Sequence, residues 1–329
     1  MLNRRTVLGM SAAAIAGTAH LGRVRAQSFV ANKLKLDAYS RTMHWLRKPE
    51  EVAQLCHEIG NTTIDLTVRA YPGHVVPDRV KTDLPPFVKR LRENGINVTV
   101  MASDIVSANA PDAEAILDTA SSLGVHHHWW RGMMVDPSLM YRQQIESLKP
   151  RVAAWARLNE RYGMKGMYHP TGSFGSGFAD IMELVRNFDP RYISIQYDTG
   201  NFQQINQQIL AQHLRIAGPY LGGIAFKDFV FEKNAPGAGT NPAGGGWPKN
   251  GWAWRQVPVG TGVLDLPLIV QTLKQVGFDG PVECQPEWPE LGGANTGGEK
   301  ITISREEFIA LLKRDYNTVT SAFAGAGLM

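Results

Sequence analysis

Residues 192–227 read YISIQYDTGNFQQINQQILAQHLRIAGPYLGGIAFK, and this stretch decides the fold. Two strand-like apolar runs, at 192–198 and 222–227, flank a segment at 203–217 whose apolar residues recur at helical spacing. A strand, a helix and a second strand in this order are typical of a parallel unit, because parallel strands need a crossover between them. The stretch therefore predicts one repeat of a parallel α/β fold.

The same order of strand and helix recurs along the rest of the chain. Strand-like runs lie at 34–39, 63–68, 97–101, 127–130, 166–169, 192–198, 222–227 and 281–285. Amphipathic stretches lie at 48–59, 84–94, 112–123, 138–162, 177–188, 203–217 and 266–276, and a final helix is expected at 304–323. Glycines follow several of them, as suits the left-handed residue after a helix: Gly60, Gly95, Gly124, Gly163 and Gly277. Eight units in about 300 residues favour a closed (β/α)₈ TIM barrel over an open sheet.

The first 26 residues have the composition of an export signal. Arg4 and Arg5 precede a short apolar run at 7–19, and no acidic residue occurs before Asp37. A charged start, an apolar stretch and small residues at the exit are typical of secretion signals, and paired arginines indicate the twin-arginine route. We expect cleavage after Ala26 and a periplasmic or secreted protein, with residues 27–329 forming one barrel domain. An uncleaved anchor and an ordinary N-terminal helix are the alternatives.

The charge and the cysteine content limit the partners and cofactors that the chain is expected to have. Removing the signal takes away four of the 34 basic residues and none of the 30 acidic ones, so the mature chain is formally neutral. A neutral chain gives no reason to expect nucleic acid or a membrane surface as a partner. We expect Cys56 and Cys284 to be buried free thiols, although an exported protein could pair them. The first strand is not followed by a fingerprint glycine loop, so no nucleotide cofactor is expected.

Polar residues stand where a barrel interior should be apolar. Residues two apart in a strand share a face, and that face carries charge near the ends of most of the predicted strands. The inward sets are Asp65, Thr67 and Arg69; His127, Trp129 and Arg131; Met167 and His169; Ser194, Gln196 and Asp198; Ala225 and Lys227; and Glu283, Gln285 and Glu287. Burying unpaired charge is costly, and barrel enzymes place function at the C-terminal strand ends. The pattern therefore predicts a site for a polyol or carbonyl compound, with or without a metal.

Two further segments have compositions that suggest a role in the site. His126, His127 and His128 look like a metal-binding tract, but they lie within a strand and alternate faces, which favours a structural role. Residues 231–256 are rich in Gly, Pro, Asn and Trp and follow the seventh strand without periodicity. This loop is expected at the barrel mouth, either as a tryptophan-bearing lid that binds sugar through Trp254 or as a rim packed on the barrel.

Several motifs resemble the xylose isomerase-like barrel superfamily, which contains sugar isomerases and epimerases, inosose dehydratases and endonuclease IV. The stretch 193–201, ISIQYDTGN, resembles the strand that ends in Asp-x-Gly-His, and 224–228, IAFKD, resembles Val-His-Leu-Lys-Asp. The stretch 257–266, VPVGTGVLDL, resembles Pro-x-Gly-x-Gly-x-x-Asp, and 274–281, KQVGFDGP, the last helix and strand. Residues 72–77, PGHVVP, are similar to exported members.

The resemblance implies a divalent metal held by Glu, Asp, His and Glu, and this chain departs from that pattern. His169 stands at the first Glu position, Asp198 matches, Ala225 replaces the His, and Glu287 matches, with Gln285 as a nearby alternative. The His expected three residues after the Asp is Asn201. A rearranged site for Mn, Mg, Zn or Co is therefore left open, with His169, Asp198, Glu287 and Gln285 as candidate ligands.

We therefore expect an exported isomerase or epimerase that removes a proton next to a carbonyl of a sugar or polyol. His169 or Glu287 would be the base, and Lys227 with Arg131 would stabilise the enolate. Arg69, Arg131, Gln196, Asn201 and Trp254 are the candidate substrate contacts. Elimination from 3-keto-glycosides is the second hypothesis, and a non-catalytic sugar-binding barrel is the third. A homo-oligomer is left open.

Overall fold

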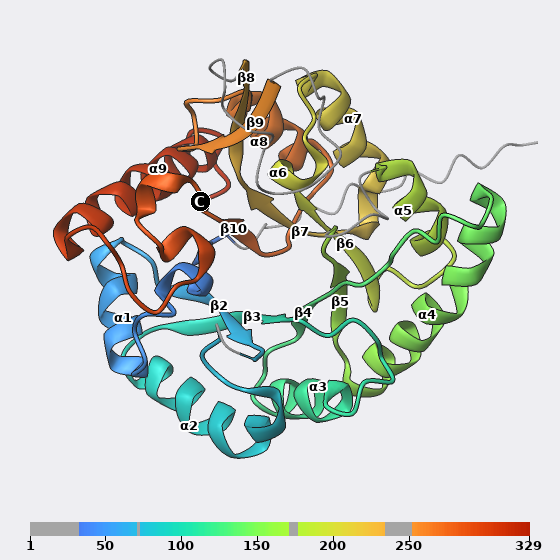
Figure 1. Cartoon of the computed structure of the whole chain (residues 1–329), viewed down its shortest axis with the longest axis horizontal. Coiled ribbons are helices and arrows are strands. Elements are labelled where there is room, and N and C mark those ends of the chain that lie inside the picture. The colour runs from blue at the N-terminus through green and yellow to red at the C-terminus, as the bar shows by residue number, and fades with distance from the viewer. Residues whose placement is uncertain (1–32, 71–72, 171–176, 234–251) are drawn as a thin grey trace, which may run out of the picture. The chain divides into compact units, whose positions relative to one another are not determined.

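Eight parallel strands close into a barrel in the computed structural model of the chain, with the helices arranged around them (Figure 1). Around the barrel the order is β1-β10-β7-β6-β5-β4-β3-β2. The strands are β1 (Leu36–Ala38), β2 (Thr63–Val68), β3 (Asn97–Ser103), β4 (His127–Trp130), β5 (Lys165–Tyr168), β6 (Ile193–Asp198), β7 (Leu221–Phe226) and β10 (Val282–Cys284). The predicted (β/α)₈ TIM barrel is confirmed.

The helices fall where the amphipathic stretches predicted them. They are α1 (Pro49–Glu58), α2 (Val80–Glu93), α3 (Ala113–Ser122), α4 (Tyr141–Tyr162), α5 (Phe178–Val185), α6 (Thr199–Phe202), α7 (Gln207–Ala217), α8 (Leu266–Gln275) and α9 (Arg305–Gly325). The five glycines that were expected to end helices all have positive φ, between 61° and 86°. The predicted helix at 203–217 begins later, because α6 and a left-handed Gln203 come first.

The apolar core lies between the barrel wall and the helices. Ile193, Ile195 and Tyr197 point outward from β6 and are fully buried in this layer. The interior holds a small separate apolar cluster of Tyr39, Val100, Ala102, Trp129 and Met167. Most other interior positions near the strand ends are polar, as the alternation in the sequence predicted.

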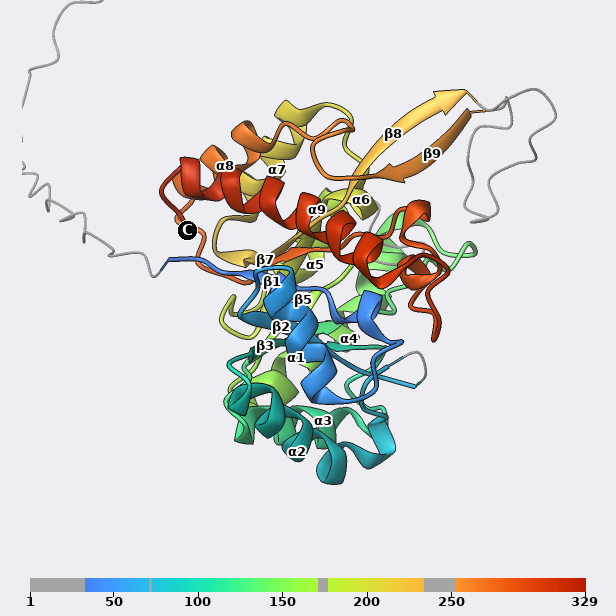
Figure 2. The same cartoon turned by 90° about the vertical axis from the view of Figure 1, so that its left-hand side faces the viewer.

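A hairpin stands at the barrel mouth, in a segment where the sequence shows no periodicity. The two ends of the segment 231–256 belong to antiparallel strands β8 (Asp228–Lys233) and β9 (Trp252–Val257), which the sequence did not predict. Residues 234–251 lie outside the part of the chain that the structure describes, so the choice between lid and rim stays a prediction. Figure 2 shows the pair extending away from the barrel beside α9 and α6. Each arm alternates in side-chain character, but the pairing partner lies far along the chain and gives no local signal.

The structure describes residues 33–70, 73–170, 177–233 and 252–329. The export signal, Pro72 and residues 234–251 of the loop lie outside these ranges, so the predictions made for them stay predictions. Cys56 and Cys284 are buried and free, as expected. Within the described ranges, no helix is both long and apolar enough to cross a membrane.

Candidate active site

The carboxylate of Asp198 is fixed by the turn that follows β6. Its Oδ1 accepts hydrogen bonds from the backbone N–H groups of Gly200 (3.0 Å) and Asn201 (2.9 Å), which caps α6. Asp198 is fully buried. The cap therefore leaves Oδ2 to face the mouth of the barrel.

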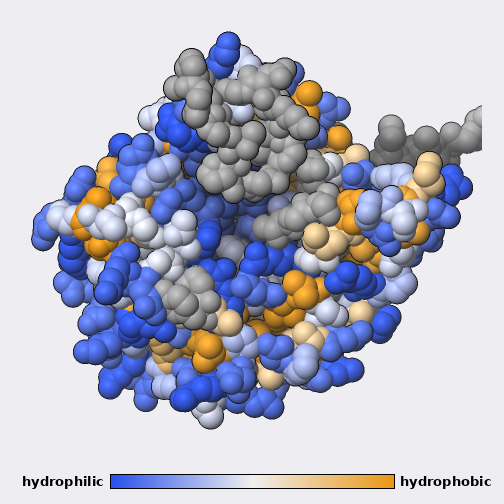
Figure 3. Space-filling model, in the orientation of Figure 1, coloured by the Kyte–Doolittle hydropathy of each residue, from blue (hydrophilic) through white to orange (hydrophobic). Residues whose placement is uncertain are grey.

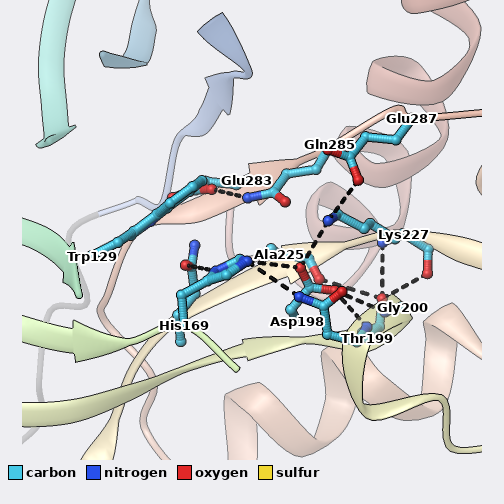
Figure 4. Close-up of polar contacts among 12 residues, drawn as sticks. Trp129, His169, Asp198, Thr199, Gly200, Ala225, Lys227, Glu283, Gln285 and Glu287 are labelled. Atoms are coloured by element: carbon cyan, nitrogen blue, oxygen red, sulfur yellow. Dashed lines mark hydrogen bonds and ion pairs between the residues drawn. The ribbon is translucent and has the colours of Figure 1, made fainter. Parts of the chain in front are cut away.

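Lys227 brings a buried positive charge to this carboxylate. Its Nζ lies 3.1 Å from Oδ2 of Asp198 and 2.8 Å from Oε2 of Glu287, and its side chain is 5% exposed (Figure 4). The lysine stem passes over Gly200, where an added Cβ would meet the Lys227 Cβ at 2.7 Å, so a glycine is required there.

His169 follows β5 and lies on the other side of Asp198. Its Nδ1 lies 2.6 Å from Oε1 of Gln196, so Nδ1 carries the hydrogen and donates it. Its Nε2 then accepts a hydrogen bond from Nδ2 of Asn201 (3.2 Å), and it also lies 3.5 Å from Oδ2 of Asp198. Trp129 stacks on the imidazole with ring centroids 4.5 Å apart, which fixes the plane of the ring.

Glu287 is held by a second set of groups that the sequence interpretation left out. The Tyr39 hydroxyl donates to its Oε1 (2.8 Å), Arg41 forms an ion pair with the same oxygen, and Gln256 reaches Oε2 from β9 (3.4 Å). Tyr39 follows β1 and Arg41 lies in the short helix η1 (Ser40–Met43). The turn after β1 folds Arg41 back over the mouth, and strand periodicity gives no sign of that.

Burial and charge set the protonation of these groups. Burial, opposed in part by Asp198, lowers the pKa of His169 to about 4, so the imidazole is neutral at pH 7. Burial alone would lower the pKa of Lys227 and raise that of Glu287. The attraction between them outweighs it, together with Asp198 beside the lysine and Arg41 beside the glutamate. The pKa of Lys227 is raised, that of Glu287 falls to about 2, and both are charged.

Gln285, predicted as an alternative metal ligand, belongs to a second buried group. Its amide donates to Oε2 of Glu283 (2.5 Å), and the Trp129 indole donates to Oε1 (3.2 Å). Burial raises the pKa of Glu283 well above its ordinary value, with Asp65 and Asp37 adding to the effect. Gln285 therefore serves as a hydrogen-bond donor to buried Glu283, and this pair lies beside the group around Lys227 in Figure 4.

The remaining predicted contacts lie at the rim or behind the histidine. Gln196 is fully buried under His169, which favours an orienting role over direct contact with substrate. Arg69 and Arg131 both pair with Asp104, which follows β3. Trp254 lies in β9 against Phe229, with ring centroids 6.0 Å apart. Figure 3, in the orientation of Figure 1, shows a hollow with hydrophilic walls at the centre of the face turned to the viewer.

Comparisons with known proteins define the family. The family model described as xylose isomerase-like TIM barrel matches residues 53–310, and the chain belongs to that family. Its fold is similar to the IolI protein with a bound zinc atom, at 17% identity over 89% of this chain and 99% of that one, with a TM-score of 0.63. A search of curated proteins found no match.

Two other similar structures are those of enzymes whose names refer to sugars. Mannonate dehydratase from Streptococcus suis serotype 2 is 12% identical over 90% of this chain and 95% of its own, with a TM-score of 0.61. The 3-keto-D-glucoside 4-epimerase YcjR from E. coli is 13% identical over 85% and 98%, with a TM-score of 0.56. At these identities the likeness shows the fold.

Three of the predicted metal ligands converge at the barrel mouth. Asp198, Glu287 and His169 have suitable donor atoms for a divalent ion. However, the ammonium of Lys227 lies between the two carboxylates, and an ammonium repels a metal ion and cannot coordinate it. Among the described residues, no three His, Cys, Asp or Glu side chains are arranged to hold a metal. With Lys227 in this position, the site does not fit a divalent metal.

Proposed function

We propose that the protein is a sugar isomerase in which Lys227 supplies the positive charge and His169 is the base. The observation that carries this proposal is the buried ammonium between Asp198 and Glu287, next to a neutral imidazole. Both groups lie at the C-terminal ends of barrel strands, where enzymes of this fold carry out their chemistry.

His169 has the properties of a general base. Gln196 holds the hydrogen on Nδ1, so Nε2 carries the lone pair, and the Asn201 amide that donates to it would give up this position to the substrate C–H. Removing a substrate proton would convert the ring to an imidazolium, which the Asp198 carboxylate 3.5 Å away would stabilise. Glu287 is a weaker candidate, because two cations hold it ionised and lower its pKa to about 2.

Lys227 would stabilise the oxyanion. The C–H bond next to the carbonyl breaks, its proton goes to Nε2, and its electron pair forms a C=C bond while the carbonyl becomes C–O⁻ beside the ammonium. The proton then returns to the neighbouring carbon as a hydroxyl proton moves to the former carbonyl oxygen. Atoms and charge balance, and the product is the isomeric sugar.

One base favours isomerisation over epimerisation. A base that takes a proton and returns it on the same face moves it between adjacent carbons, whereas inversion needs a donor on the opposite face. Elimination from a keto-glycoside begins with the same proton removal, and it is the second candidate because the pairing of base and cation serves both reactions. The products distinguish isomerisation from elimination, because only elimination releases the aglycone.

Proton exchange tests the proposal directly. In D₂O, NMR of a panel of aldoses, ketoses and keto-glycosides should show deuterium entering a C–H next to the carbonyl of one of them. Lys227→Met should lower turnover at least about 100-fold, as for loss of an oxyanion donor, with little change in melting temperature. Lys233→Met, on the exposed end of β8, is the control.

Metal removal provides an independent readout. Dialysis against EDTA should leave the exchange rate of the wild-type protein unchanged. The proposal is overturned if Lys227→Met retains its activity, or if EDTA abolishes activity and a divalent ion restores it.

A further inference from the structure

Three arginines from different loops gather at one side of the barrel mouth. Arg41 comes from η1, Arg69 follows β2 and Arg131 follows β4. Their side chains are 29%, 12% and 26% exposed, so all three are largely withdrawn from water. Long cationic side chains normally keep their charged ends in solvent, and burying these ends is costly unless anions accompany them.

The carboxylates that pair with these arginines are shared. Arg69 and Arg131 both pair with Asp104, Arg69 at 3.5 Å, and Arg41 pairs with Glu287, which also binds Lys227. In the printed ion pairs of the described residues, one carboxylate thus serves two guanidiniums at the rim, and a second serves Arg41 and the buried ammonium.

Asp104 differs from the arginines that it contacts. Its side chain is 47% exposed, far more than either guanidinium. Carboxylates that solvent reaches are held weakly by their partners. A carboxylate from a ligand could therefore replace Asp104 at the guanidiniums and be buried more completely than Asp104 is.

We infer that Arg69 and Arg131, with Arg41 beside them, bind a carboxylate of the substrate, and that the sugar is a sugar acid such as a hexuronate. This inference rests on the proposed function, because it names the substrate class of the same site. A planar guanidinium can hold a carboxylate in bidentate fashion, and both arginines already pair with the same carboxylate, that of Asp104.

The cluster lies close to the proposed base. The charge of Arg131 contributes to lowering the pKa of His169, and Glu287 joins Arg41 to Lys227 through its two oxygens. A substrate anchored by its carboxylate at the arginines would therefore extend toward Lys227 and His169.

Calorimetric binding with matched sugars tests the inference. D-glucuronate and D-galacturonate should bind about 10- to 100-fold more tightly than D-glucose and D-galactose, as expected for hydrogen bonds to a charged group. The preference should disappear in Arg131→Met and in Arg69→Met. It should remain in Arg191→Met, which removes an exposed arginine paired with Asp189 before β6.

Three outcomes overturn the inference. One is equal binding of acid and neutral sugars, or no binding of the uronates. Another is a preference that survives both arginine variants. The third is tighter binding of glucose 6-phosphate than of glucuronate, which would assign the cluster to phosphate. If neutral sugars still exchange their protons, only the inference fails; if no sugar of either kind exchanges deuterium, the proposed function fails.

Discussion

Asp65 lies inside the barrel on β2 and holds the turn after β1. Its Oδ1 accepts a hydrogen bond from the Ser40 backbone (2.6 Å), and burial raises its pKa to about 7. At Asp65 the folded state therefore binds more protons than the unfolded state between the ordinary pKa of 3.8 and about 7. The resulting stabilisation of the folded state is fully present below that pH window and is lost as the pH rises through it.

Asp65→Asn should remove this pH dependence. Relative to the wild-type protein, the variant should become more stable by about 1 kcal/mol or more between pH 5 and pH 7.5, measured by urea unfolding at both values. His44 and His74, whose pKa values burial lowers to about 2 and about 3, act in the opposite direction. They are common to both proteins and cancel in the comparison.

Exposed Asp118→Asn is the matched control for the substitution itself. An Asp65→Asn difference that does not change with pH would contradict the assignment of a proton to Asp65 in the folded state.

Part of the site could be predicted at the scale of single residues. His169, Asp198, Lys227 and Glu287 were found because each ends an alternating strand or follows one closely, and charge on an inward face is conspicuous. Tyr39 and Arg41 were missed, because Arg41 reaches Glu287 only through the η1 turn. Protonation could not be predicted either, since it depends on which cations surround Glu287 and how deeply His169 is buried.

At the scale of elements, Asp228 connects the hairpin to the loop that follows it. Its Oδ2 accepts from the backbone N–H groups of Gly260 and Gly262, and its Oδ1 from those of Phe229 and Leu264, at 2.8–3.2 Å. A Cβ on Gly262 would meet Oδ1 of Asp228 at 2.3 Å, so the backbone can approach only at a glycine. The spacing of Asp228 and the glycine-rich stretch thus has a structural explanation.

Asp228→Asn should destabilise the protein strongly. The amide presents N–H to backbone donors on one side, and loss of hydrogen bonds to a charged acceptor costs about 1.5–3 kcal/mol each. We expect a loss of at least about 3 kcal/mol in urea unfolding. Asp279→Asn, an exposed change, should have little effect. A variant as stable as the wild-type protein would contradict this account of the loop.

The barrel elements were predicted well because their patterns are local. Each strand and helix buries one face against its neighbours, so periodicity within the element is sufficient. The β8–β9 hairpin was missed because its arms, at 228–233 and 252–257, are recognised only through each other. Its place after β7 was nevertheless correct, which puts Gln256 within reach of Glu287.

At the scale of the whole molecule, the barrel has two buried thiols that pair with nothing. Burial raises the pKa of Cys56 and of Cys284, which keeps both protonated and unreactive. A protein that folds before it enters an oxidising compartment would protect these thiols, whereas an unfolded chain would expose them. This feature is compatible with the proposed export route, in which the chain folds first.

We propose that the chain is exported by the twin-arginine pathway and loses Met1–Ala26. Arg4→Lys together with Arg5→Lys keeps the charge and removes the paired arginines, so the precursor should accumulate in the cytoplasm. Mass spectrometry of cell fractions should find the wild-type protein in the periplasm, shortened by 26 residues, and the variant at full length in the cytoplasm. Arg23→Lys with Arg25→Lys, after the apolar run, should still be exported. Full-length wild-type protein confined to the cytoplasm would contradict the proposal, and export of the double variant at the normal rate would assign the segment to the general secretion route, which does not require the arginine pair.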